Sequence, residues 1–214
     1  MRTPTVIKCL LAATAAATPL LCDAASTYTS GAGTLTATAT VNFQINIPQT
    51  LYLRVGTGSA YPGTLATNPT TDLIQFTPAL GSVGNGTAVA GTGGDLNGGV
   101  ETAAVLSNGG NTVSLSATEA AAGLIDGNGD SIPFTQITTA ATALTGTYTL
   151  LQAPVLNAAG GSTTVTLTPA GNPKVVQADA KWTFSYANSV TPAGGTYGGV
   201  GVNNSTVTYT ATMP

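Results

Sequence analysis

Strict alternation of apolar and polar residues between Thr34 and Ile47 is the most regular pattern in the chain. A period of two predicts a β-strand with one buried and one solvated face. At about 3.3 Å per residue the run would span about 45 Å, whereas strands usually have about 5 to 6 residues. We expect it to cross a sandwich into a second sheet, or to pair in part with something outside its own domain. Its apolar positions, the candidate assembly residues, are Leu35, Ala37, Ala39, Val41, Phe43, Ile45 and Ile47.

Shorter alternating runs follow, separated by glycine-rich turn signals. Pro48 marks a corner or sheet edge because proline cannot donate to a ladder, and Leu51 to Val55 alternate after it. Ser116 and Glu119 have the spacing of a capping box before three alanines and predict one helical turn. The pattern predicts an all-β fold, an antiparallel immunoglobulin-like β-sandwich with a long N-terminal strand and at most one short helical turn. Further strands are expected at 73–77, 87–90, 100–106, 112–116, 132–138, 144–151, 163–168, 180–187 and 205–212.

The first residues predict a secretory signal peptide over 1–24. A basic start precedes the apolar stretch 9–21, and small residues then predict cleavage near Ala24 or Ala25. Lipid attachment at Cys22 is an alternative, but a leucine stands before it where such signals need Ala, Gly or Ser. We expect export through the general secretory pathway to the periplasm, and then to the cell surface, a fimbria or the extracellular space.

The mature chain is expected to contain no cysteine, because Cys9 and Cys22 both lie in the predicted signal peptide. Without disulfides, the exported protein must be stabilised by its core. We expect a flexible leader at 25–33 and a single β-sandwich domain over 34–214.

Composition excludes several kinds of chemistry. Histidine is absent, which excludes Ser-His-Asp and Cys-His nucleophiles and imidazole metal ligands. Five basic and eight acidic residues give a net charge of -3 and no basic patch for nucleic acid. A hydrolase using two carboxylates remains an alternative, but no acidic residue lies in a motif that indicates a cleft. We expect no enzymatic activity and no cofactor.

Two groups of residues are candidate binding sites. Asp126, Asn128 and Asp130 place oxygen ligands at alternate positions, as calcium loops begin, but the later glycine and glutamate of such loops are missing, which favours a plain turn. The second group, candidate contacts for sugar rings, comprises Tyr61, Trp182 and Tyr197. A tryptophan on an alternating strand is also typical of a sandwich core.

The signal peptide, the long alternating strand and a Gly/Thr/Asn-rich β-domain closing with VTYTATMP resemble bacterial pilin-type or fimbrial surface proteins. In the chaperone-usher pilins an N-terminal extension donates a strand to a groove in the neighbouring subunit. The resemblance implies that part of Thr34 to Ile47 has this role. It also implies a structural or accessory fimbrial subunit, with other pilus subunits, copies of itself and a periplasmic chaperone as partners. The alternative is a secreted carbohydrate-binding adhesin module that recognises surface glycans.

Overall fold

The computed structural model describes residues 26–59, 61, 63–157, 162–171 and 174–214, so the predicted signal peptide lies outside the described residues. The chain divides into two units, with the boundary between Ile47 and Pro48. The second unit therefore begins at Pro48, whereas the sequence predicted a domain beginning at Thr34.

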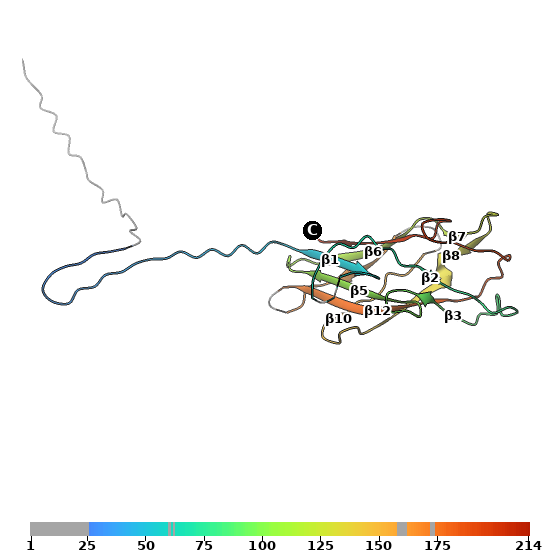
Figure 1. Ribbon diagram of the computed structural model, residues 1–214, viewed down its shortest axis with the longest axis horizontal. Helices are drawn as coiled ribbons and strands as arrows, with labels where there is room; N and C mark the ends of the chain where they lie inside the picture. The colour runs from blue at the N-terminus through green and yellow to red at the C-terminus, as the bar shows by residue number, and fades with distance from the viewer. Residues whose placement is uncertain (1–25, 60, 62, 158–161, 172–173) are drawn as a thin grey trace, which may run out of the picture. The chain divides into compact units, whose positions relative to one another are not determined.

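Two sheets make up most of the second unit (Figure 1). The larger has the order β1 (Leu51–Val55), β5 (Val100–Ser107), β12 (Val176–Tyr186) and β10 (Thr149–Leu150), and β12 also pairs with β3 (Val89–Ala90) and β9 (Ile137–Thr142). The smaller has the order β11 (Ser162–Leu167), β6 (Val113–Glu119) and β13 (Val207–Thr212). Two further pairs are β2 (Ile74–Gln75) with β4 (Thr92–Gly93) and β7 (Gly123–Ile125) with β8 (Ser131–Pro133).

All of these pairings are antiparallel except that of β10 with β12. The predicted all-β antiparallel sandwich is confirmed. Its immunoglobulin-like arrangement stays a prediction.

The core lies between the two sheets and is built by alternation along their strands. Val113, Leu115 and Ala117 of β6 are fully buried, and the serine and threonine residues between them are not. Trp182 of β12 is 0% exposed, and its indole Nε1 donates a hydrogen bond of 2.8 Å to the Leu151 carbonyl. Its ring centroid lies 5.2 Å from that of Tyr209 on β13. This aromatic pair joins the larger sheet to the smaller one.

The predicted helical turn at Ser116 to Glu119 is wrong, because both residues lie in β6. The capping-box spacing is a local signal, whereas β6 is paired on one side with β11 and on the other with β13. Among the described residues the one helical element is a 3-10 turn at Phe134–Gln136, which separates β8 from β9.

The prediction of a strand from Thr34 to Ile47 is also wrong in the structure of the single chain. Residues 26–47 belong to no strand and every one of them is exposed. The alternative that the run crosses its own sandwich is thereby removed. Both edges of β5 are occupied, by β1 and β12, and both edges of β6 by β11 and β13, so neither central strand has an edge left for it.

Candidate functional site: an uncovered apolar segment and an apolar groove

The alternating segment, Thr34 to Ile47, is the first part of the candidate site. Before it, the chain bends at residues 31–33 and doubles back. The Thr27 hydroxyl oxygen accepts a hydrogen bond of 2.9 Å from the backbone N–H of Thr38 and also donates to the Thr38 carbonyl. The Thr29 hydroxyl donates to the Thr36 carbonyl at 3.2 Å. Threonine side chains thus hold the first residues of the segment.

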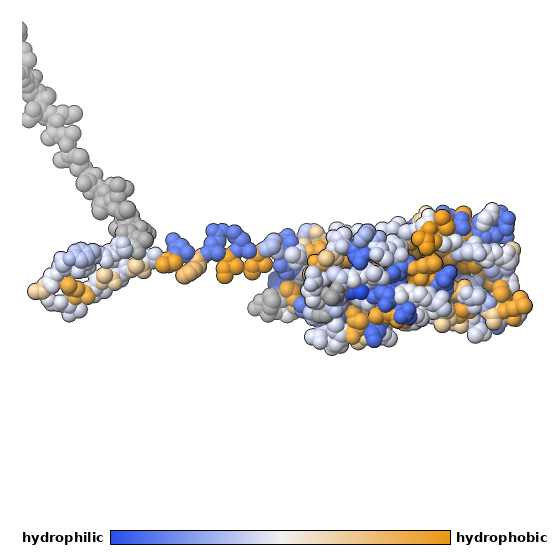
Figure 2. All heavy atoms as spheres, viewed as in Figure 1, coloured by the Kyte–Doolittle hydropathy of each residue, from blue (hydrophilic) through white to orange (hydrophobic). Residues whose placement is uncertain are grey.

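The later residues of the segment carry a row of large apolar side chains in water. Val41, Phe43, Ile45 and Ile47 are 69%, 90%, 84% and 75% exposed. Figure 2 shows apolar residues along one edge of this part of the chain and polar residues along the opposite edge. Burying one such side chain contributes about 1.5 to 3 kcal/mol. A continuous row of this kind is typical of a surface that another protein covers.

An apolar groove in the second unit is the other part of the site. It has a volume of about 1160 Å³ and is lined by residues of β1 and β13, which are outer strands of the two sheets, together with residues of 66–78 and 192–201. Each of these strands has a ladder partner on one side only among the named strands, β5 for β1 and β6 for β13. An extended chain entering the groove would therefore find backbone edges to pair with. Its apolar lining includes Leu53, Val55, Phe134, Ile137, Phe184, Val207 and Tyr209.

The groove also contains a buried polar group with no partner. Tyr186 is 5% exposed, and its ring lies 6.2 Å from that of Phe76. Within the described part of the chain, its hydroxyl is the buried side-chain atom that makes no hydrogen bond. Burial raises the pKa of Tyr186, so the hydroxyl keeps its proton. An unmade hydrogen bond of a buried group costs about 1 to 3 kcal/mol, which an occupant with a polar atom would recover.

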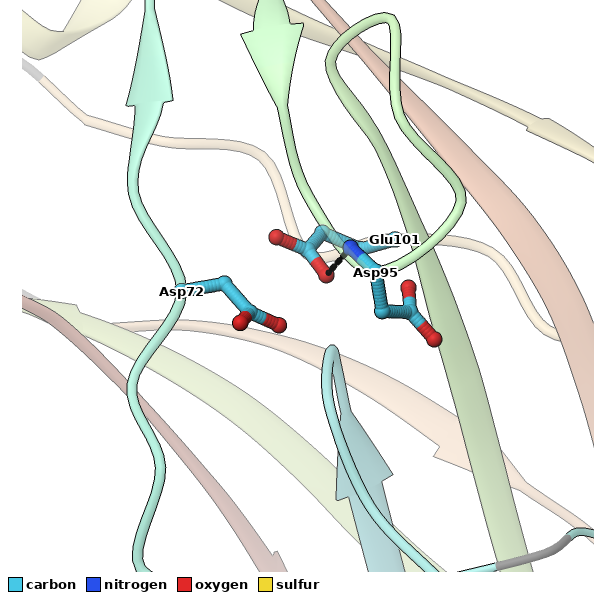
Figure 3. Close-up of side chains that lie close together, drawn as sticks. All are labelled: Asp72, Asp95 and Glu101. Atoms are coloured by element: carbon cyan, nitrogen blue, oxygen red, sulfur yellow. Dashed lines mark hydrogen bonds between the residues drawn. The ribbon is translucent and has the colours of Figure 1, made fainter.

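Three carboxyl groups meet beside the groove (Figure 3). Asp72, Asp95 and Glu101 come from three separate segments, and one oxygen of each lies within 4.8 Å of the others. Arg54 forms an ion pair of 2.8 Å with Asp95, whose backbone N–H donates to Glu101 Oε2 at 3.3 Å. The Thr57 hydroxyl donates to Asp72 Oδ1 at 2.7 Å.

The chemistry of this cluster is that of crowded carboxyls. Burial, with the charge of Asp72 adding to it, raises the pKa of Glu101 to about 8. Glu101 is therefore mostly protonated at neutral pH, because burial penalises the charged form of its carboxyl. The oxygens lie close enough together to share a proton or to hold a divalent cation. A tight turn brings Asp95 close to Glu101, whereas Asp72 comes from a distant segment of the chain that the sequence pattern did not place here.

The candidate calcium loop is a turn between β7 and β8. Asp126 Oδ1 accepts hydrogen bonds from the backbone N–H groups of Asn128 and Asp130, both at 2.9 Å. Its Oδ2 accepts one of 3.1 Å from the Asn128 side chain. Desolvation raises the pKa of Asp126, but these hydrogen bonds together outweigh it and lower the pKa. Both oxygens of Asp126 are thus occupied in stabilising the turn.

The three candidate sugar contacts do not form one surface. The prediction for Trp182 is wrong, because a side chain with no exposed surface cannot stack on a sugar ring. Tyr61 donates a hydrogen bond of 3.3 Å to Asp179 on β12, and its ring lies parallel to that of Tyr52 at 6.5 Å. Tyr197 lines the groove and donates to the Ala193 carbonyl at 3.0 Å.

No protein-family model, curated protein or solved structure matches this chain. Among the described residues, no helix has the length and apolar character needed to span a membrane.

Proposed function

We propose that this protein is a non-enzymatic structural or accessory subunit of a bacterial surface fimbria, exported by the general secretory pathway. It assembles by placing the alternating segment of one copy in the groove of another. The observation that supports this most directly is that one chain carries both a row of uncovered apolar side chains and an apolar groove lined in part by two outer strands.

Burial of the apolar side chains and backbone pairing are the two contributions that would drive such an assembly. Burying Val41, Phe43, Ile45 and Ile47 contributes about 6 to 12 kcal/mol at about 1.5 to 3 kcal/mol each. Each net ladder hydrogen bond adds about 0.5 to 1.5 kcal/mol. Association costs about 4 to 15 kcal/mol in lost freedom. In this mode of recognition the ladder supplies affinity, and alternate side chains in pockets supply specificity.

A charge placed on the apolar edge of the segment tests the proposal. Phe43→Asp in the full chain is expected to abolish concentration-dependent oligomers in analytical ultracentrifugation, because a carboxylate would enter the groove unpaired. Gln44→Asp is the matched control, with the same new charge on the polar edge, and is expected to leave assembly intact. Circular dichroism checks that both variants keep the fold. Unmodified protein that stays monomeric at high concentration without a chaperone would refute the assembly role.

A further inference from the structure

One loop of the second unit binds both the start of that unit and the last residues of the chain. This loop, residues 108–112, joins β5 to β6 and follows directly on Ser107, the last residue of β5. On one side the Asn108 amide nitrogen donates a hydrogen bond of 2.9 Å to the Pro48 carbonyl. The Asn108 Oδ1 accepts one of 2.7 Å from the Thr50 N–H, and the Asn108 N–H donates to the Thr50 carbonyl at 3.4 Å. One residue thus holds the backbone on both sides of Gln49.

The other side of the loop holds the chain end in a similar way. The Asn111 amide nitrogen donates to the Pro214 carbonyl at 2.8 Å, and the Ser107 hydroxyl lies 2.9 Å from Met213 Sδ. The Met213 side chain packs directly over Gly109, where a Cβ would meet its sulfur. Asn108 and Asn111 are thus two asparagines of one loop, but the first binds the start of the second unit and the second binds Pro214.

Asn108 lies where a force applied through the residues before Pro48 would reach the second unit. β1 is an outer strand of five residues held by β5, and its first pair is Leu51 with Ser107. Tension applied through Ile47 would open β1 from that end, one pair after another. The bonds of Asn108 to Pro48 and Thr50 lie before the first pair and would be loaded first. Because proline has no N–H, the carbonyl is the one backbone group that Pro48 offers to a partner.

We propose that Asn108 is a latch, a positioning residue that fixes Pro48 and Thr50 so that tension on the alternating segment does not open β1. That assembly supplies the tension rests on the proposed function. The latch itself is a property of the isolated protein and is tested without assembly.

Asn108→Ala tests the latch, with Asn111→Ala as the matched control. In hydrogen exchange on the monomeric full chain, the Thr50 amide is expected to exchange about ten-fold faster in Asn108→Ala and unchanged in Asn111→Ala. Asn108→Asp keeps an acceptor for Thr50 but faces the Pro48 carbonyl with an oxygen. It is expected to lose only the bond to Pro48, so the Thr50 amide should exchange at a rate between those of the unmodified protein and Asn108→Ala. This variant provides the test if Asn108→Ala folds poorly.

Single-molecule pulling applies the tension directly. Handles are attached at the N-terminus and at a cysteine replacing exposed Thr138 of β9, in a full chain in which Cys9 and Cys22 are replaced by serine. Asn108→Ala is expected to lower the force of the first unfolding event, and Asn111→Ala to leave it unchanged. Equal forces for all variants, or an equal loss in both alanine variants, would overturn the latch. Failure of assembly with this force difference preserved would instead count against the proposed function alone.

Discussion

Replacing Glu101 by glutamine should change how the stability of the protein depends on pH. The Glu101 side chain is 4% exposed at the start of β5, beside Asp72 and Asp95. Burial raises its pKa from an ordinary value of 4.5 to about 8. A carboxyl with a higher pKa in the folded state binds its proton more tightly there than in the unfolded chain. Its stabilising contribution is therefore complete below about pH 4.5 and is lost as the pH rises to about 8.

The size of this effect follows from the shift. A change from 4.5 to about 8 at about 1.4 kcal/mol per pH unit sets an upper limit of about 5 kcal/mol. Because effective dielectric constants of about 20 apply even to buried sites, the effect should be well below this limit, and we expect about 2 kcal/mol to be observed. Glutamine has no proton to lose and keeps a hydrogen-bond acceptor for the Asp95 N–H, so Glu101→Gln should not show this loss.

Urea denaturation followed by tryptophan fluorescence measures the difference. Trp182 is the one tryptophan of the chain and lies in the core, so it reports on unfolding of the second unit. Between pH 5 and pH 9 the unmodified protein should lose about 2 kcal/mol of unfolding free energy relative to Glu101→Gln. Asp130→Asn, which removes an exposed carboxylate, serves as the control and should follow the unmodified protein. Parallel curves for the unmodified protein and Glu101→Gln would show that the reasoning about burial is wrong.

Three further substitutions test other parts of the structure. The lowered pKa of Asp126 means that its carboxylate stabilises the fold above the ordinary pKa of 3.8, and that this contribution is lost as the pH falls. In Asp126→Asn the free energy of unfolding should therefore fall less steeply below about pH 4. The same steepness in both proteins would contradict this. The side chain of Asn188 forms hydrogen bonds with the backbone of Gly84, Ser82 and Thr87, and its own backbone has a φ of 54°. Asn188→Ala should therefore lower the free energy of unfolding in urea by about 2 to 3 kcal/mol. A loss below about 0.5 kcal/mol would show that these bonds contribute little. Trp182→Phe removes the bond to Leu151 and leaves a cavity, so calorimetry should show a loss of about 2 to 4 kcal/mol, and an unchanged midpoint would be evidence against the described core.

Alternation along the chain predicted some strands closely and others poorly, since the predicted strand 132–138 contains part of β8, a 3-10 turn and the start of β9. Leu51 to Val55 was predicted with the bounds of β1, because the alternating run ends at Gly56, whose φ of 81° suits glycine. β5, β11 and β13 lie within two residues of their predicted ranges. The backbone itself sets this information, since successive side chains of a strand point to opposite faces.

The contacts that each strand or segment makes with the rest of the chain could be seen only in the tertiary structure. The alternation from Thr34 to Ile47 predicted one apolar face, but both sheets of the sandwich form without that segment. The groove, and the approach of Asp72 to Asp95 and Glu101, likewise depend on contacts between residues distant in sequence. A periodic pattern records which side chains must leave water, whereas the surface that receives them is a long-range contact. That contact exists only once the strands have paired.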